Sequence, residues 1–230
     1  MEPAKTAGRR KLEPDPAVRA VILSAASEVL REQGVGALSI AQVLDRSQLS
    51  TRAFYRHFDS KDQLVAALFL EMARVEVTRL RKKMAAAPHP VSAVAAWIDG
   101  RLDLAFNDQI RSDLRRVSVE AQSQMFAAPE LVGAAYRQIL QPLIEQLRAG
   151  VERGLFTEIN PDDEAMSIQG VVWSNTERQW AAGTCDLGDL RDRVQRFCLR
   201  GLGVSDDSIT QIVGEATARR TKSPTRTVSR

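Results

Sequence analysis

The chain has 230 residues, which is long enough for one sizeable core and a small second domain. Alternating runs of Val, Ile and Thr are absent, whereas Ala, Leu, Arg, Gln and Glu dominate, so the composition predicts an all-α fold. No apolar run approaches the ~20 residues that a membrane-spanning helix needs. The basic residues near the start are not followed by an apolar segment, so we expect a cytoplasmic protein with no membrane partner.

The net charge is +3, from 32 basic and 29 acidic residues. Basic residues gather at the two ends, which contain Arg9, Arg10, Lys11, Arg219, Arg220, Lys222, Arg226 and Arg230. This distribution favours local contact with phosphate groups over a coat that binds nucleic acid with its whole surface.

The first regular element predicted is a helix that begins after residue 15. Residues 1–14 contain Pro, Lys, Arg and Gly without periodicity and are expected to form a flexible basic arm. Asp15 followed by Pro16 is typical of a helix start, with a capping residue and a proline at the first helical position. Gly34 is expected to end the helix. Its apolar stripe comprises Val18, Val21, Ile22, Ala25, Ala26, Val29 and Leu30.

Residues 39–58 contain two short predicted helices separated by a tight corner. Ser39 and Gln42 have the spacing of a capping box at the start of the first helix. Leu38 and Val43 are placed to form a hydrophobic staple over the same end. Ser50 is expected to cap the second helix. Ser60 and Gln63 repeat the capping-box spacing at the start of a third, long helix.

The second short helix is predicted to stand on an apolar base formed by Leu49, Phe54 and Phe58. The side chains left facing outward are Thr51, Arg52, Tyr55 and Arg56. A short helix of this kind suits the major groove of DNA, because Arg pairs with guanine O6 and N7 while Tyr and Thr reach phosphates or a thymine methyl group. Residue pattern alone leaves open an ordinary surface helix with solvated charges.

The series Tyr55-Arg56-His57-Phe58, followed by residues 59–64, closely resembles the end of the DNA-binding domain of TetR-family transcriptional regulators. The resemblance covers about residues 17–70. It implies phosphate contacts for Ser39 and Lys61, groove contacts for the outward side chains, and a position near the DNA backbone for His57. The implied DNA-binding residues are Ser39, Ser50, Thr51, Arg52, Tyr55, Arg56, His57 and Lys61.

Two positions depart from the family pattern. The family usually has a small residue and Gly at the corner, where this chain has Ser47 and Gln48. A non-Gly residue in a left-handed conformation costs roughly 1 kcal/mol or more, so we expect a slightly different corner. The family also often has Gly early in the second short helix, where Arg52 adds a potential base contact.

The rest of the chain is predicted to form further helices. The long helix from Ser60 carries an apolar series, Leu64, Val65, Leu68, Met72, Val75 and Leu80, and ends near Pro88. Other helices are expected over 92–106, 109–124, 129–154, 161–182, 187–202 and 205–220. Pro142 is expected to kink or divide the helix at 129–154. Cys198 lies among apolar residues, as a buried thiol would.

The helices at 161–182 and 187–202 carry more apolar residues than a small exposed hairpin can bury. The TetR resemblance implies that this pair forms a four-helix interface in a homodimer, which also suits two recognition helices reading successive turns of DNA. Packing within the monomer core is the alternative, and both can hold. The interface candidates are Val172, Trp180, Leu190, Val194 and Phe197.

The resemblance also implies a small, mostly apolar effector bound between the central helices. Each candidate is also explained as ordinary core, and no ligand class is indicated. The candidates are Trp97, Phe106, Met125, Phe126, Tyr136, Leu140 and Trp173. No Gly-rich phosphate loop, Gly-x-Ser-x-Gly motif or Cys/His metal spacing is present, so neither enzyme activity nor a cofactor is expected.

The predicted organisation is an arm at 1–14, a DNA-binding domain at 15–70 and an effector-binding and dimerisation domain at 71–204. A last helix and a disordered basic tail follow at 205–230. The predicted function is a homodimeric repressor that binds a palindromic operator through residues 39–61 and responds to an effector. The alternatives are a ligand-independent regulator or activator of the same fold, and a helical module that binds a protein partner.

Overall fold

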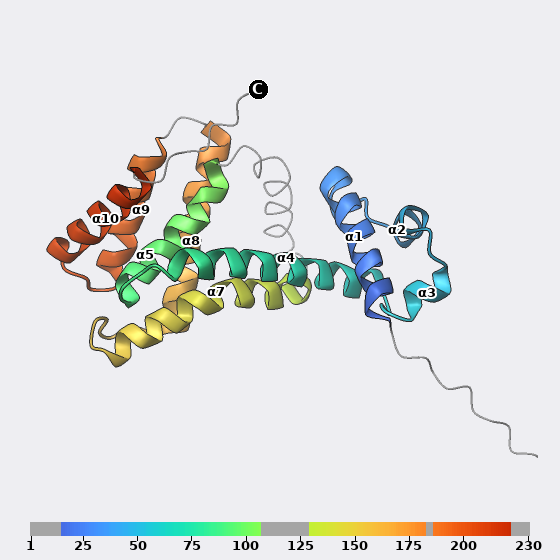
Figure 1. Ribbon diagram of the computed structural model, residues 1–230, viewed down its shortest axis with the longest axis horizontal. Coiled ribbons are helices and arrows are strands. Elements are labelled where there is room, and N and C mark those ends of the chain that lie inside the picture. Colours follow the sequence, from blue (N-terminus) through green and yellow to red (C-terminus); the bar gives the residue numbers. More distant parts are fainter. Residues whose placement is uncertain (1–14, 107–128, 183–185, 222–230) are drawn as a thin grey trace, which may run out of the picture. The chain divides into compact units, whose positions relative to one another are not determined.

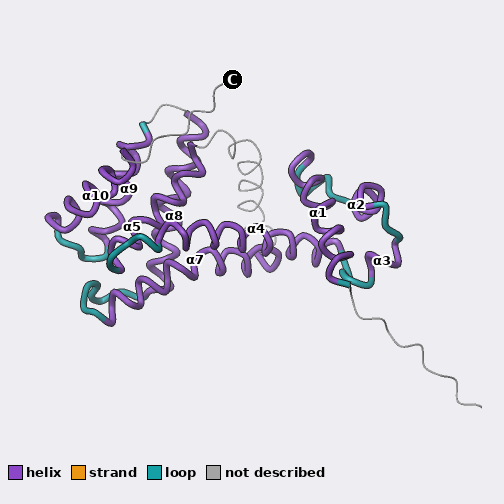
Figure 2. The backbone as a smooth tube through the Cα atoms, viewed as in Figure 1, coloured by secondary structure: helices purple, strands orange, loops and turns teal. Residues whose placement is uncertain are grey.

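The computed structural model describes residues 15–106, 129–182 and 186–221, and every regular element within these ranges is an α-helix (Figures 1 and 2). The all-α prediction is confirmed. The chain divides into two compact units, Met1–Leu68 and Phe69–Arg230.

The first unit contains α1 (Pro16–Gln33), α2 (Ile40–Ser47), α3 (Thr51–Tyr55) and the start of α4 (Lys61–Met84). The Asp15 carboxylate accepts a hydrogen bond from the backbone N–H of Ala17 at 2.9 Å, and Gly34 ends α1 with a φ of 83°. The predicted apolar stripe of α1 is buried from Ile22 to Leu30, whereas Val18 is partly exposed and Val21 is 46% exposed.

The second unit is a helical bundle around α5 (Pro90–Phe106). This helix packs against α7 (Pro129–Glu152), α8 (Pro161–Ala182), α9 (Leu187–Gly201) and α10 (Asp206–Thr221). Because neighbours surround α5, apolar side chains cover most of its circumference instead of one stripe. The predicted inward residues Val94, Trp97, Ile98 and Leu102 are all fully buried.

Two features differ from the sequence-based expectation. Val75 of α4 was expected to face inward and is 66% exposed. The helix α7 runs through Pro142 as a single element, so the division that was one of the two expected outcomes does not occur, and the expected kink stays a prediction. The predicted helix at 109–124 lies outside the described residues.

Helix starts in the second unit are capped by side chains that lie next to them in sequence. The Asn160 side chain accepts a hydrogen bond from Asp162 N at 3.1 Å, ahead of the acidic first turn of α8. The N-cap of α9 is Asp186, which accepts from the N–H groups of Gly188 and Asp189. Cys198 is buried, and this desolvation raises the pKa of its thiol to about 12, so it packs as a neutral, small apolar side chain.

The last helix belongs to the second unit. Ile209, Ile212 and Val213 of α10 are buried in the same apolar cluster as α5 and α9. The part of α10 from Ile209 to Val213 is therefore packed onto the bundle.

Gly150 of α7 should be intolerant of a side chain. A Cβ at this position would lie 2.2 Å from the ring of Phe156, which is itself buried. Gly150→Ala should therefore lower the free energy of unfolding by about 1–3 kcal/mol through overpacking. Gly214→Ala is the matched control, because nothing lies within 4 Å of its Cβ position in α10. That change should stabilise by about 0.5–1 kcal/mol in urea unfolding. Equal responses at the two glycines would contradict the packing described for Phe156.

Candidate DNA-binding site

The start of α2 is fixed by a reciprocal pair of hydrogen bonds. The Ser39 hydroxyl accepts from Gln42 N at 3.2 Å, and the Gln42 side chain accepts from Ser39 N at 3.1 Å. This is the predicted capping box, and it satisfies two backbone donors that the helix leaves open. The predicted staple residues Leu38 and Val43 are both buried. The entry angle of α2 is therefore set by local sequence.

The corner between α2 and α3 turns at Gln48. This residue has φ 54° and ψ 31°, the left-handed conformation, and its backbone N–H donates to Leu44 O. The Gln48 side chain donates to Asp45 O and closes the turn further. The corner thus adopts the conformation that suits glycine even though a side chain is present.

The charge at the end of α2 is paired within the unit. Arg46 donates to the Glu32 carboxylate at 2.8 Å, and Glu28 lies 3.8 Å away. The hydrogen bond with Arg46 lowers the pKa of Glu32, so the pair stays ionised at neutral pH. Arg46 therefore ties α2 to α1 and is less available to a ligand than the arginines of α3.

Helix α3 has only five residues and rests on aromatic side chains. Phe54 and Phe58 are buried, as predicted, with ring centroids 5.7 Å apart. The Arg19 guanidinium of α1 lies over the Phe58 ring at 5.2 Å, a cation–π contact. The Ser50 hydroxyl accepts from Ala53 N at 3.2 Å and caps the helix. A helix this short is held by its cap and its base.

The outward face of α3 carries Thr51, Arg52, Tyr55 and Arg56, and all four are exposed. The Tyr55 ring is 52% exposed and meets the buried Phe54 ring edge-on at 5.3 Å. One side of the Tyr55 ring is thus supported by Phe54, while the residue as a whole stays exposed. Two guanidinium groups, a phenol and a threonine methyl on one short helix match the chemistry of base edges and phosphates in a major groove.

The remaining predicted DNA-binding residues differ in accessibility. Ser39 and Lys61 are partly exposed. Both ring nitrogens of His57 are buried, with no hydrogen-bond partner among the described residues. In this conformation the His57 ring is therefore not presented to a ligand. Ser60 accepts from Gln63 N at 3.1 Å, but the Gln63 side chain accepts from Asp59 N, one residue before the predicted box.

The predicted effector residues are brought together only in part. Trp97 and Leu140 are fully buried in the core of the second unit, and Trp97 donates from Nε1 to Ile139 O at 3.4 Å. Tyr136 is partly buried, and its hydroxyl accepts from Gln169 at 3.4 Å. Trp173 packs edge-on against Trp180 at 5.7 Å. Met125, Phe126 and the side chain of Phe106 lie outside the described residues.

The predicted interface residues fall into two groups. Val172, Leu190 and Val194 are buried in the core of their own unit, and Trp180 is partly buried. Phe197 is 63% exposed, and so is a residue not predicted for this role, Met166, at 66%. Met166 belongs to the apolar residues of the helix at 161–182, but apolar character alone does not distinguish an exposed position from a buried one.

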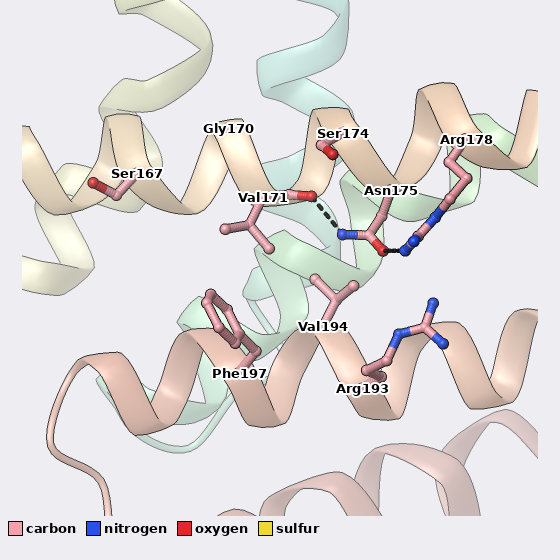
Figure 3. A pocket seen from close by; sticks show the side chains of 9 residues that line it. All are labelled: Ser167, Gly170, Val171, Ser174, Asn175, Arg178, Arg193, Val194 and Phe197. Atoms are coloured by element: carbon pink, nitrogen blue, oxygen red, sulfur yellow. Dashed lines mark hydrogen bonds between the residues drawn. The ribbon is translucent and has the colours of Figure 1, made fainter.

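A groove of about 520 Å³ runs between α8 and α9 beside Phe197 (Figure 3). Its floor is formed by small or short side chains of α8, and Asn175 donates to Val171 O at 2.8 Å along one wall. Arg178 and Arg193 border one end, as Figure 3 shows. The complete lining is Ser167, Gly170, Val171, Ser174, Asn175, Arg178, Arg193, Val194 and Phe197.

Other kinds of site find no support in the described ranges. Within residues 15–106, 129–182 and 186–221, no group of three or more His, Cys, Asp or Glu side chains is arranged to hold a metal ion. A search of the same residues finds no helix that is both long and apolar enough to cross a membrane.

Comparison with known proteins points to the same part of the chain. Residues 22–68 match the family described as bacterial regulatory proteins, tetR family. An HTH-type transcriptional repressor of Mycobacterium tuberculosis, Rv3405c, is 41% identical over 63 residues, which is 27% of this chain and 33% of the relative. The match thus spans about a third of the length of that relative.

Solved structures resemble the chain over most of its length. RolR in complex with resorcinol superposes with a TM-score of 0.61 at 18% identity, covering 86% of this chain and 93% of RolR. The regulator FadR from Bacillus subtilis in complex with stearoyl-CoA has a TM-score of 0.63 at 18% identity, covering 79% of this chain and 98% of FadR. At these identities the likeness establishes the fold.

The first unit is accordingly a helix-turn-helix domain of the kind found in transcriptional regulators. Residues 22–68 of this domain are similar to the tetR family of bacterial regulatory proteins. Its relatives are regulators and not enzymes, in agreement with the prediction of no enzyme activity.

The left-handed corner offers a test of the local geometry. Gln48→Gly should be about 1 kcal/mol more stable than Gln48→Ala, because glycine adopts a positive φ without steric cost whereas alanine does not. Both variants lose the side-chain bond to Asp45 O, so their difference isolates the backbone conformation. Urea unfolding of the two proteins measures it. Equal stability would contradict a left-handed Gln48.

Proposed function

We propose that the protein is a cytoplasmic, homodimeric transcriptional repressor that binds an inverted-repeat operator in double-stranded DNA and is released by a small, mostly apolar effector. The observation that carries this proposal is the outward face of α3, where Arg52, Tyr55 and Arg56 stand exposed above the buried Phe54 and Phe58. Repression is supported by the similarity to the HTH-type transcriptional repressor of Mycobacterium tuberculosis.

Each exposed residue has a role that follows from its chemistry. Arg52 is suited to a forked pair of hydrogen bonds with guanine O6 and N7, and Thr51 to contact with a thymine methyl group. Tyr55 and Arg56 are suited to the groove and the adjoining phosphates. Ser39, Ser50 and Lys61 flank α3 and are suited to positioning on phosphates, which carries affinity but little sequence information.

The face of α8 and α9 supports the homodimer. Met166 and Phe197 are the large exposed apolar residues of this pair, and the groove beside them has a floor of small residues, namely Ser167, Gly170 and Ser174. A two-fold axis brings identical faces together, so a bulky side chain on one copy meets the groove on the other. The dimer would present two copies of α3, and operators of this kind have half-sites about one helical turn apart.

The proposal of an effector is supported by two solved structures of similar fold that contain bound ligands. RolR was solved with resorcinol and FadR from Bacillus subtilis with stearoyl-CoA, and both superpose on most of this chain. The aromatic residues Trp97, Tyr136 and Trp173, all at or near the core of the second unit, are candidates for lining such a site. Phe106, Met125, Phe126 and Leu140 complete the proposed set.

Arg52→Ala and Tyr55→Ala should each weaken operator binding by about tenfold or more, because one good base contact is worth about 1–3 kcal/mol. Arg74→Ala is the matched control, since Arg74 is an equally exposed arginine paired with Glu71 outside the first unit. The operator is first obtained by selecting sites from a random duplex library at two salt concentrations. Affinities for the recovered operator are then measured by fluorescence anisotropy.

Recovery of one inverted repeat, with an affinity that falls steeply with salt, is the expected result of the selection. In the affinity measurements, the two α3 variants are expected to lose binding, whereas Arg74→Ala should bind like wild type. Recovery of no sequence preference, or unchanged affinity in both α3 variants, would contradict the proposal and favour a helical module that binds a protein partner.

Phe197→Glu should dissociate the dimer, because it places a charge in the centre of the proposed interface. Val151→Glu is the control: Val151 is also an exposed apolar residue, but it lies on α7 and outside the groove. Sedimentation velocity should give a monomer for the first variant and a dimer for the second and the wild type. A dimeric Phe197→Glu protein would rule out this face as the interface.

A further inference from the structure

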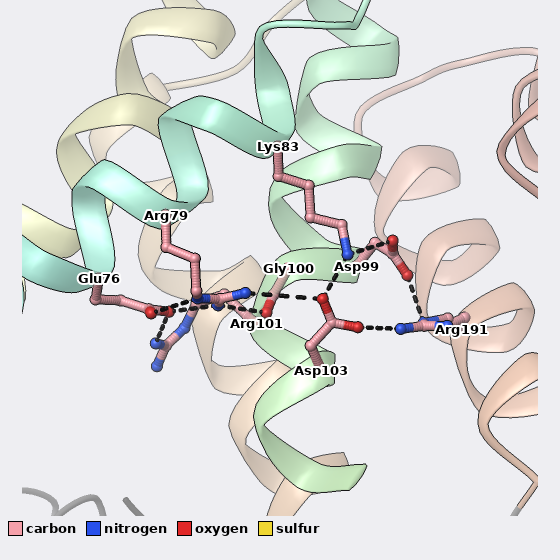
Figure 4. A network of polar contacts seen from close by, with 8 residues as sticks. All are labelled: Glu76, Arg79, Lys83, Asp99, Gly100, Arg101, Asp103 and Arg191. Carbon is pink, nitrogen blue, oxygen red and sulfur yellow. Dashed lines mark hydrogen bonds and ion pairs between the residues drawn. The ribbon is translucent and has the colours of Figure 1, made fainter. Parts of the chain in front are cut away.

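A network of seven charged side chains joins three helices of the second unit (Figure 4). Four cations and three carboxylates take part, and α4, α5 and α9 all contribute. In the sequence, the three members on α4 have the spacing of charged residues on an ordinary solvent-exposed helix face. The members are Glu76, Arg79, Lys83, Asp99, Arg101, Asp103 and Arg191.

The first half of the network joins α4 to α5. The Glu76 carboxylate accepts from Arg79 Nε at 2.8 Å and from Arg101 Nη1 at 2.8 Å. Arg79 also donates to the backbone carbonyl of Gly100 at 2.6 Å. The side chains of Glu76 and Arg101 are largely buried, at 13% and 10% exposure. These bonds therefore act in a medium where charge interactions are strong.

The second half joins α4 and α5 to α9. Lys83 Nζ lies 2.7 Å from Asp99 Oδ2 and also contacts the Asp103 carboxylate. Arg191 of α9 pairs with the same two carboxylates through Nε and Nη2. Asp99 and Arg191 are both buried. The two carboxylates of α5 are thus shared between a cation of α4 and a cation of α9, as the dashed lines in Figure 4 trace.

The carboxylate of Glu76 remains ionised at neutral pH. Burial of Glu76 by itself disfavours the carboxylate, but the hydrogen bond from Arg79 and the charge of Arg101 outweigh it and lower the pKa of Glu76. Because the folded pKa lies below the unfolded value of about 4.3, ionised Glu76 stabilises the fold above that pH. This contribution is lost as the pH falls through the folded pKa.

Stability alone does not account for so many buried charges. Replacing a buried ion pair by apolar side chains of similar volume is often neutral or stabilising, because the pair must first lose its hydration. What ion pairs add is direction: each bond fixes the angle and the register of the two side chains, which apolar contacts do not.

The apolar attachment of α4 to the bundle is small. Among the described residues, α4 contributes only Leu80 and Met84 to the main apolar cluster of the second unit. At the point of contact, a Cβ on Gly100 would lie 2.8 Å from Leu80 Cδ2, so α4 and α5 approach closely there. With two apolar anchors near its end, the rotation and register of α4 depend on the charged residues around Gly100.

We propose that this network is a positioning device that fixes α4 relative to α9 and thereby sets the half-site spacing that the protein accepts in an operator. Helix α4 begins at Lys61 in the first unit and continues into the second, and α9 carries Phe197 of the proposed homodimer face. Arg191, Asp99 and Lys83 form a continuous chain of ion pairs between these two helices. The inference rests on the proposed function, because it assumes a dimer bound to two half-sites.

The test uses the full-length dimer and the selected operator, with one or two base pairs inserted between its half-sites. Wild type should lose at least about tenfold in affinity with one inserted pair, since a rigid dimer cannot follow the added rise and rotation. The double variant Asp99→Leu/Arg191→Met, which removes one charge of each sign, should lose less than about threefold. Its affinity for an isolated half-site should equal that of wild type.

Three further proteins complete the experiment. Arg200→Met removes an exposed ion pair with Asp206 at the end of the same helix and should discriminate spacing like wild type. Arg191→Lys keeps the charge and should restore much of the discrimination. Glu76→Leu/Arg101→Met opens the α4–α5 half of the network and should relax spacing as well. It also provides a second variant if Asp99→Leu/Arg191→Met fails to fold by circular dichroism.

The outcomes separate the two proposals. A wild-type protein that selects no inverted repeat removes the proposed function and this inference together. A wild type that selects one, but tolerates inserted base pairs, overturns only the positioning role. So does a folded, dimeric double variant that discriminates spacing as strongly as wild type.

Discussion

A helix of five residues does not hold its own shape in water, because the cost of nucleating a helix exceeds what one turn of hydrogen bonds returns. The surface that we propose for DNA contact therefore depends on what lies underneath α3. Phe54 and Phe58 supply an apolar base, Ser50 supplies the cap, and the left-handed Gln48 supplies the corner that brings α3 to its place. The outward residues are then free to serve recognition, since none of them is needed to keep the helix folded.

The second unit is held together by two kinds of interaction. Around α5, apolar packing on most sides gives a core that has little choice of arrangement. Between α4 and the bundle, the contact is mostly ionic and directional, with only Leu80 and Met84 as apolar members among the described residues. The two kinds of contact are thus built from different chemistry, and the ionic one lies on the helix that begins in the first unit.

Much of the local structure could be predicted from sequence because its causes are local. The caps at Asp15 and Ser39 and the proline-led starts of α1, α7 and α8 each depend on residues within one turn. Predictions were wrong where burial depends on distant neighbours. Val21 and Val75 have the periodicity of inward residues, yet each lies at the edge of its stripe and is exposed. The buried Arg191 was not foreseen either, because its two carboxylate partners lie 88 or more residues away. At Gln48, the family pattern indicated the position of the turn, but only the backbone angles reveal that a glutamine adopts the conformation of a glycine.

The exposure of Met166 and Phe197 has a consequence for how the regulator is used in the cell. In the proposed homodimer, these side chains are exposed to solvent only while the subunits are dissociated. Formation of the DNA-binding species is then second order in subunit concentration, so operator occupancy rises more steeply than the amount of protein made. Dilution of the protein during cell growth would lower operator occupancy even without an effector. A modest rise in synthesis would restore the occupancy.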